Sequence, residues 1–256
     1  MKLTTFLSSP VKTIFYHNLG RLGYQPALEL QKKLVNNHFL PTSAASEASD
    51  VVLLVEHDPV YTVGLRDKAY SEPVRRQLES RGAEFYRTDR GGLITFHGPG
   101  QLVVYPILNL RRPPFEASVR WYVCHLESTI IELCKSFYDL PSKRTEHTGI
   151  WVGDNKIAAL GIHNRRAVVS HGLALNCDTD LSWYDQIVPC GIADPSKWVT
   201  SLSREADASV TVNDVIPQYL TSFEKVFGCR LKELPTLEGL VDDEVLESTL
   251  GKNAAA

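Results

Sequence analysis

Four side chains of this sequence could carry chemistry, namely Cys190, Lys156, His97 and His171. Cys190 lies between a proline and a glycine, which places it on a fixed turn, and a thiol at the rim of a pocket can act as a nucleophile. Lys156 begins a predicted strand, and each histidine has a neighbouring glycine that would let a ligand approach the backbone closely. Each also has a structural interpretation: a buried cysteine, a solvated lysine at a turn, and two hydrogen-bonded core histidines. Taken singly, none of them identifies a function.

The stretch around His97 is the most unusual in the chain, because four glycines and a proline surround one histidine. Residues 94–96 alternate as a short strand, and Gly98-Pro99-Gly100 breaks it. A second strand follows, and Pro106 is expected to end that strand or to place it at a sheet edge. Strand, rigid turn and returning strand together predict one wall of a small-molecule pocket. The alternative is a tight hairpin in which His97 is incidental.

The remaining elements do not alternate strictly between strand and helix. The pattern predicts helices near 26–34, 73–80, 116–138 and from 211 onward, and strands at 51–55, 84–88, 148–153, 156–162 and 167–176. The strand 51–55 is apolar on both faces, which is typical of a central position in a sheet. We therefore predict a mixed-sheet α/β or α+β fold rather than a doubly wound one.

Composition narrows the class of protein. The chain has 256 residues, of which 43% are hydrophobic and 22% charged, as in ordinary globular proteins, and no apolar run is long enough to span a bilayer. A net charge of -3 argues against binding nucleic acid through a bulk positive field. The five cysteines are odd in number and include no CxxC pair, which disfavours a disulfide framework and a zinc ribbon.

Several separated motifs together resemble the octanoyltransferases of lipoate biosynthesis, also called lipoate–protein ligase B. The resemblance covers roughly Phe15 to Gly228 and is closest to eukaryotic organellar members. The residues that carry it are Asp89-Arg90-Gly91-Gly92-(x)2-Thr95-x-His97-Gly98-Pro99-Gly100-Gln101-(x)3-Tyr105-Pro106, Glu56-His57-x-Pro59, Gly149-x-Trp151-Val152, Lys156-Ile157-(x)3-Gly161, Ser170-His171-Gly172-Leu173-Ala174-Leu175-Asn176 and Pro189-Cys190-Gly191.

The resemblance implies a fold, a reaction and roles for particular residues. The fold would be the mixed α/β catalytic domain shared by biotin and lipoate protein ligases. Cys190 would take an octanoyl group from acyl carrier protein as a thioester, with Lys156 as its activating partner, and would pass it to a lysine of a lipoyl domain without ATP. The acyl pocket would be lined by Arg90, Gly91, Gly92, Leu93, Ile94, Thr95, Phe96, His97, Ala159, Leu160, Gly161, His171, Gly172, Leu173 and Ala174. One departure is His163, where many members carry arginine.

Cofactors, partners and compartment follow from the same resemblance. No metal or cofactor is expected, since the donor acyl group is carried on the phosphopantetheine of acyl carrier protein. Acceptors would be lipoyl domains such as glycine cleavage H protein and the E2 subunits of 2-oxoacid dehydrogenases, with neither nucleic acid nor a membrane as a partner. Residues 1–20 contain lysine, serine and threonine but no acid, so we expect import into mitochondria, with a cytoplasmic location as the alternative. The expected division is a short presequence over 1–13, one catalytic domain over 14–228 and a peripheral C-terminal tail over 229–256.

The physics of a Cys190–Lys156 pair limits what the lysine can do. A thiol with a pKa near 8.5 is about 3% thiolate at pH 7, and an ammonium that lowered this pKa by about two units would raise the thiolate to roughly three quarters. Nucleophilicity falls with pKa along a Brønsted slope of about 0.4 to 0.5, so the net gain is about threefold. We therefore hypothesise that Lys156 also helps to deprotonate the incoming substrate lysine.

The pocket itself should be apolar, because six methylenes buried at about 0.8 kcal/mol each contribute close to 5 kcal/mol. Leu93, Ile157 and Leu160 are the expected walls. Two other functions stay open: an ATP-dependent lipoate or biotin ligase on the same fold, and a non-catalytic acyl-binding protein. The Pro-Cys-Gly cysteine favours the transferase over both.

Overall fold

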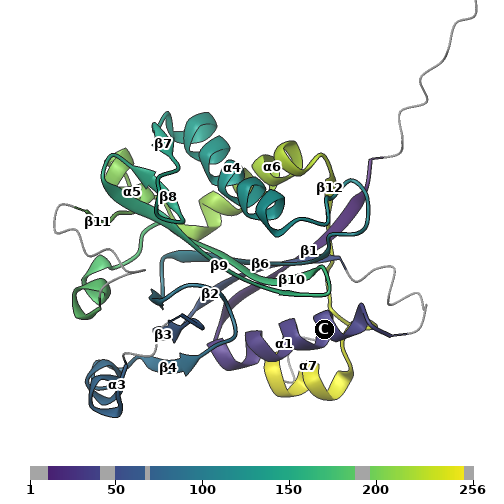
Figure 1. The fold of residues 1–256 in the computed structure, drawn as a ribbon, viewed down its shortest axis with the longest axis horizontal. Coiled ribbons are helices and arrows are strands. Elements are labelled where there is room, and N and C mark those ends of the chain that lie inside the picture. Colours follow the sequence, from purple (N-terminus) through teal and green to yellow (C-terminus); the bar gives the residue numbers. More distant parts are fainter. Residues whose placement is uncertain (1–10, 41–49, 67–69, 188–196, 251–256) are drawn as a thin grey trace, which may run out of the picture.

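The computed structural model describes residues 11–40, 50–66, 70–187 and 197–250. Cys190 lies outside these ranges. The elements, labelled in Figure 1, are β1 (Thr13–Leu22), α1 (Tyr24–Asn37), β2 (Val51–His57), β3 (Val60–Val63), α3 (Glu72–Glu79), β4 (Glu84–Arg87), β5 (Ile94–His97), β6 (Gln101–Asn109), α4 (Val119–Tyr138), β7 (Ser142–Lys143), β8 (Ile150–Val152), β9 (Asn155–Arg165), β10 (Val168–Asn176), a 3-10 turn (Leu181–Gln186), β11 (Trp198–Val199), α5 (Leu202–Ala206), α6 (Val212–Phe227), β12 (Arg230–Glu233) and α7 (Asp243–Leu250).

Two mixed sheets organise the described residues. The larger runs β12-β1-β2-β6-β10-β9-β8-β7, with β11 added beside β9, and the smaller runs β4-β3-β5. Parallel pairs join β1 to β2 and β12, whereas β2, β6, β10, β9 and β8 pair antiparallel in turn. Strand β2 is interior, as its apolar sequence predicts. The predicted mixed-sheet class is confirmed.

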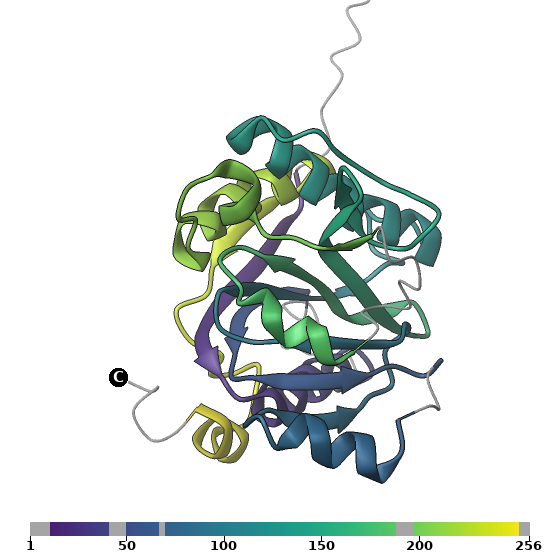
Figure 2. The same ribbon diagram turned by 90° about the vertical axis from the view of Figure 1, so that its left-hand side faces the viewer.

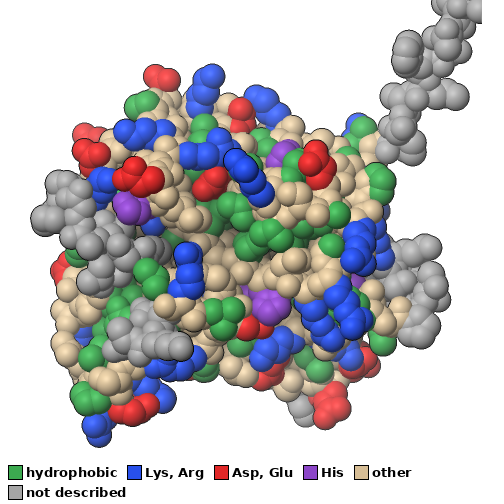
Figure 3. Space-filling view, in the orientation of Figure 1, with side chains coloured by type: hydrophobic (Ala, Val, Ile, Leu, Met, Phe, Trp, Pro, Cys, Tyr) green, Lys and Arg blue, Asp and Glu red, His purple; other side chains and the backbone are tan. Residues whose placement is uncertain are grey.

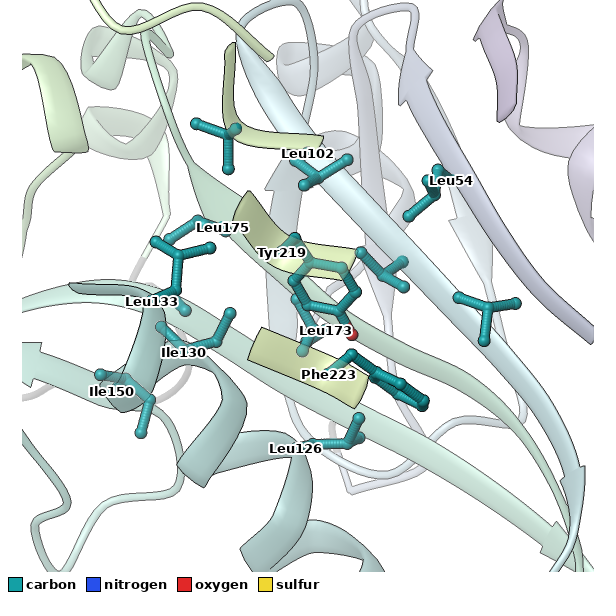
Figure 4. Packing of buried hydrophobic residues seen from close by; sticks show 14 of the residues in the cluster. Leu54, Leu102, Leu126, Ile130, Leu133, Ile150, Leu173, Leu175, Tyr219 and Phe223 are labelled. Carbon is teal, nitrogen blue, oxygen red and sulfur yellow. The ribbon is translucent and has the colours of Figure 1, made fainter. Parts of the chain in front are cut away.

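Helices cover the larger sheet on both faces. Figures 1 and 2 place α4 and α6 on one side of it and α1 and α7 on the other. The first core contains Leu126 and Ile130 of α4 and Phe223 of α6, packed on Leu173 of β10 (Figure 4). The second contains Leu30 and Leu34 of α1 against Leu53 of β2. The predicted helices therefore form because each buries one apolar stripe on the sheet.

Strands β5 and β6 do not form the hairpin that the glycine stretch left possible. Strand β5 pairs with β3 in the smaller sheet, whereas β6 pairs with β2 and β10 in the larger one. The turn between them carries the chain from one sheet to the other. Gly100 in this turn has φ +78, and a Cβ there would lie 2.3 Å from the carbonyl oxygen of Asp178. A glycine is therefore required on both conformational and steric grounds.

Pro106 lies inside the central strand β6, so the prediction that it ends the strand or marks an edge is wrong. Its neighbours pair normally with β2, but pairing with β10 is recorded at Val104 and Leu108 and not between them. The register places Pro106 opposite His171, whose backbone N–H donates to Gln31 Oε1 at 3.0 Å instead. Pro106 has no N–H to donate across this gap, and the His171 amide donates to a side chain from α1, so the strand continues.

The segment after Cys229 is more ordered than its sequence pattern predicts. Strand β12 pairs in parallel with β1 at the sheet edge, and helix α7 packs beside α1. Leu237, Leu240 and Val241 are buried in the second core. For the described residues, the prediction of a peripheral tail without pattern is corrected, because non-local pairing with β1 and α1 organises a segment whose own periodicity is weak.

We predict that Leu237→Ala lowers the free energy of unfolding by about 2 to 4 kcal/mol, because it removes a side chain that is 1% exposed from a packed core. Urea unfolding followed by circular dichroism measures this. Glu238→Ala, one residue further on an exposed position, is the matched control and should change it by less than about 0.5 kcal/mol. Equal, small effects of the two variants would instead support the prediction that this segment is a peripheral tail.

Candidate active site

A cavity of about 310 Å3 lies along β9 and β10, where the larger sheet meets the glycine stretch. The glycine stretch contributes Arg90, Gly92, Leu93, Thr95 and His97 to its lining. Strand β9 contributes Ala159, Leu160 and Gly161, and β10 contributes His171, Gly172, Leu173 and Ala174. The structure therefore brings most of the residues named for an acyl pocket to one cavity.

Four residues named from the sequence lie elsewhere. Ile94 and Phe96 alternate with Thr95 along β5 and point into the core with Tyr61, because successive strand side chains face opposite ways. Ile157, expected as a wall, is buried in the core beneath α4 for the same reason. Gly91 lines a shallower groove that adjoins the cavity.

That shallower groove lies between α4 and β9. Its lining includes Val123 of α4 and Leu160 and Ile162 of β9, and it shares Leu160, Gly92 and Gly161 with the cavity. In Figure 3, hydrophobic side chains gather in this central region of the face, below α4. Groove and cavity therefore adjoin.

Several cavity residues were not selected from the sequence. Tyr24, Val103 and Tyr105 line it and are buried, whereas Arg66, Glu146 and His147 line it and are accessible. The buried lining residues form the floor of the cavity, and the accessible ones form its rim. Tyr105 belongs to the motif that carried the resemblance, so a signal for it was present, but Tyr24 opens a helix and looks like an ordinary core residue.

Arg90 is a buried cation that the surrounding backbone satisfies. Its Nη2 donates to the carbonyl of Thr62 at 2.6 Å, to the Thr62 hydroxyl at 2.8 Å and to the carbonyl of Leu93 at 3.0 Å, and Nη1 donates to the carbonyl of Gly91 at 2.9 Å. A guanidinium offers five donors and no acceptor, so carbonyl oxygens suit it. Arg90 thus fixes the glycine stretch against β3.

Lys156 is 3% exposed on β9 and lines a small hollow next to the cavity. Its Nζ lies 4.9 Å from the centre of the Trp151 ring, a cation–π contact. Within the described ranges, no carboxylate forms an ion pair with it. Lys156 is therefore buried and pairs with none of the described carboxylates, so it is not the solvated turn lysine considered above.

The described chain on either side of Cys190 returns to this hollow. Tyr184, shortly before residues 188–196, lines it, and so does Val199, shortly after them. Strand β11 pairs in parallel with β9, with Val199 opposite Lys156.

Two buried histidines at the cavity floor, His57 and His97, are each held by their own hydrogen bonds. His57 lies between the carbonyl of Leu22 (Nδ1, 2.8 Å) and the hydroxyl of Tyr105 (Nε2, 2.8 Å). The carbonyl can only accept, so Nδ1 carries the proton and Nε2 accepts from Tyr105. His97 Nδ1 lies 2.7 Å from Gln101 Oε1. Burial lowers the pKa of His57 to about 4 and that of His97 to about 3. Both are therefore uncharged at pH 7.

A carboxylate joins β9 and β10 next to His171, a residue of the cavity lining. Asp89 Oδ1 lies 2.9 Å from His171 Nε2, and Oδ2 lies 3.1 Å from His163 Nδ1. The hydrogen bond from His171 holds the pKa of Asp89 down to about 2. His163, which stands where arginine was expected, thus serves as a second partner of this carboxylate.

Neither a metal site nor a membrane span was found in the part of the chain that the structure describes. No cluster of three or more histidine, cysteine, aspartate or glutamate side chains is placed there to hold a metal ion. No described helix is both long and apolar enough to cross a bilayer.

Comparison with known proteins identifies the family. The sequence model described as "Lipoyl protein ligase A/B catalytic domain" matches residues 23–224. The chain belongs to this family. It is 51% identical over 214 residues to the mitochondrial octanoyl-[acyl-carrier-protein]:protein N-octanoyltransferase LIPT2 of Danio rerio, a match covering 84% of this chain and 92% of that one. It is 36% identical to the octanoyltransferase of Desulforamulus reducens, covering 93% and 99% respectively.

Solved structures of the family support the fold. A lipoate-protein ligase A bound with ATP superimposes with a TM-score of 0.70, covering 96% of both chains at 12% identity. At this identity the likeness shows the fold alone. The catalytic-domain fold of lipoate ligases, predicted from the sequence motifs, is confirmed.

The buried histidines predict how the stability of this family member depends on pH. An unfolded histidine has a pKa near 6.5, so between pH 6.5 and about 4 the unfolded chain binds protons that folded His57 and His97 do not. Stability should therefore fall as pH is lowered through this window, by up to about 1.4 kcal/mol per pH unit for each histidine.

Replacing His57 separates its contribution to this pH dependence from that of His97. His57→Gln should be less stable than the native protein at pH 8, because the bond from Nδ1 to the carbonyl of Leu22 is lost, yet should lose less stability on acidification to pH 5. Urea unfolding at pH 5, 6, 7 and 8 measures both. An unchanged slope against pH would show that His57 is not the buried neutral group described above.

Proposed function

We propose that this chain is an ATP-independent octanoyltransferase, which moves an octanoyl group from acyl carrier protein to a lysine of lipoyl domains. The main observation behind this proposal is that two proteins, 51% and 36% identical to this chain over most of its length, are named octanoyltransferases. The cavity, the buried Lys156 beside it and the presence of Cys190 in the sequence support the same conclusion.

The reaction has two steps, each of which exchanges one acyl bond. The Cys190 thiolate attacks the carbonyl carbon of the donor thioester, a new carbon–sulfur bond forms, and the pantetheine thiol leaves with a proton. The neutral amine of the acceptor lysine then attacks the enzyme thioester, an amide forms, and the Cys190 thiol is released. Both steps need proton transfer, and the second begins with an ammonium that must first lose its proton.

Lys156 is the group proposed to serve both steps. Its position over Trp151 without a carboxylate partner among the described residues leaves its Nζ available to substrate groups. Its hollow shares Thr95, Ala159 and Ala174 with the cavity, so an acyl group in the cavity would place its carbonyl next to the ammonium.

The alternatives have less support. The ATP-bound relative shares the fold at 12% identity, which brings no ATP site to this chain. The buried cation of the cavity, Arg90, donates to protein carbonyls, so its hydrogen bonds are not arranged for a phosphate. Together with the neutral His57 and His97, this suits an uncharged acyl chain.

Partners and compartment follow from the reaction. The donor would be octanoyl-acyl carrier protein, and the acceptors would be lipoyl domains such as glycine cleavage H protein and 2-oxoacid dehydrogenase E2 subunits. No dissociable cofactor is required. The Danio rerio relative is named mitochondrial, which supports a mitochondrial location for this chain.

The first test is an intact mass of the protein after incubation with octanoyl-acyl carrier protein, without ATP or acceptor. We expect one added octanoyl group that maps to Cys190 and is removed by hydroxylamine, and no adduct on Cys190→Ser. No adduct on the native protein, with activity that appears only on addition of ATP and free octanoic acid, would make it a ligase instead.

The second test separates the two steps with Lys156→Met. If the lysine acts through thiolate formation alone, acylation of Cys190 should slow by about threefold and acceptor transfer should be unaffected. We expect a larger defect, of about tenfold or more, in transfer from preformed acyl-enzyme to the lipoyl domain. Lys143→Met, at an exposed lysine, is the control. A defect confined to acylation would rule out a role in deprotonating the acceptor.

A further inference from the structure

Thr95 carries a buried hydroxyl that forms no hydrogen bond with the described part of the protein. The residue is 4% exposed on β5, and its Oγ1 has no hydrogen-bond partner among the described residues. Leaving a buried polar group unpaired is costly, so natural proteins seldom do so without a reason. Thr62, directly opposite on β3, shows the contrast, because its hydroxyl is bonded to Arg90 and lies 3.3 Å from His97 Nε2.

The unused hydroxyl lies where the cavity meets the hollow of Lys156. Three residues line both spaces, namely Thr95, Ala159 and Ala174. Ala159 and Ala174 have no polar side-chain atoms, and they pair with each other in the β9–β10 ladder. Among the described residues that line both spaces, Thr95 is therefore the one whose side chain can donate a hydrogen bond.

Other polar groups that line the Lys156 hollow are already engaged. Asn176 donates through Nδ2 to the carbonyl of Thr200 at 2.9 Å, and its Oδ1 accepts from Gln101 at 2.8 Å and from Tyr184 at 3.2 Å. The threonine hydroxyl can thus turn toward a substrate atom without breaking a bond within the protein.

We propose that the Thr95 hydroxyl donates a hydrogen bond to the carbonyl oxygen of the acyl group, and that this bond strengthens when the oxygen becomes an oxyanion. The inference rests on the proposed function. When the sulfur nucleophile adds to the carbonyl carbon, the C=O π electrons move to the oxygen. When the tetrahedral intermediate collapses, they return and the pantetheine sulfur leaves. Thr95 gives up no proton in either step, and it lowers the energy of the charged intermediate.

This role differs from that of Lys156. A hydroxyl held by a strand is fixed in place before the reaction, so no reorganisation is needed as charge develops. The same oxygen becomes negative again when the acceptor amine attacks, so Thr95 should assist both half-reactions. It should contribute little to binding of the acyl chain, since its bond to an uncharged carbonyl is weak.

Thr95→Val tests the proposal, because valine keeps the shape and removes the hydroxyl. We expect the single-turnover rate of acylation by octanoyl-acyl carrier protein to fall by about 100-fold, and transfer to the lipoyl domain to fall similarly, with calorimetric binding of the uncharged amide octanamide little changed. Thr95→Ser should restore most of both rates. Thermal unfolding should be unchanged or at a higher temperature in Thr95→Val, since an unpaired buried hydroxyl is lost.

Matched variants separate this role from a structural one. Thr62→Val should unfold at a lower temperature than the native protein, because it removes a bonded hydroxyl. A similar loss of stability in Thr95→Val would show a structural partner and overturn the proposal, as would acylation of Thr95→Val at the native rate. A native protein that forms no acyl-enzyme would instead overturn the proposed function, and the role of Thr95 with it.

Discussion

The buried guanidinium of Arg90 joins three parts of the chain on which the cavity depends. It donates to Thr62 in the smaller sheet and to the carbonyl of Leu93 in the glycine stretch. Its aliphatic part lies across β9, where a Cβ on Gly161 would come within 3.0 Å of Arg90 Cδ. A buried cation that lacks partners costs several kcal/mol, so the arrangement that supplies the carbonyls is strongly favoured over looser ones. These hydrogen bonds therefore hold the glycine stretch that lines the cavity in place.

Around this one charge, the floor of the cavity is kept neutral. His57 and His97 are uncharged because burial disfavours their protonated forms, and each is held in a single tautomer by an acceptor that cannot donate, the carbonyl of Leu22 or Gln101 Oε1. These hydrogen bonds hold both rings without adding charge, which suits a site for an acyl chain. Two further charged residues lie outside the cavity lining, Lys156 in the adjoining hollow and Asp89, which pairs with His171 of the lining.

The pairing of β6 with β10 is interrupted between Val104 and Leu108, beside the cavity. Pro106 cannot donate, and His171 opposite it adopts φ +53 while Gln31 accepts its amide hydrogen. Next to it, a Cβ on Gly172 would lie 2.2 Å from the carbonyl oxygen of Val104. Strained backbone of this kind persists where the surroundings over-determine it, and it is concentrated at functional sites. Here it aims the His171 side chain at Asp89 and keeps the strand surface open to the cavity.

Local structure and family were determined by the sequence itself. The helix predicted from residue 211 onward begins with a capping box of Thr211 and Asp214, and Gly153 and Asp154 connect the predicted strands β8 and β9 as a hairpin, because these signals act between near neighbours. Contacts between residues that lie far apart along the chain were decided by the tertiary structure. Gln31 of α1 accepts the His171 amide hydrogen opposite Pro106, Tyr24 joins the cavity floor from a helix start, and β12 completes the sheet beside β1. No local periodicity encodes such contacts, since they depend on which faces meet when the whole chain packs.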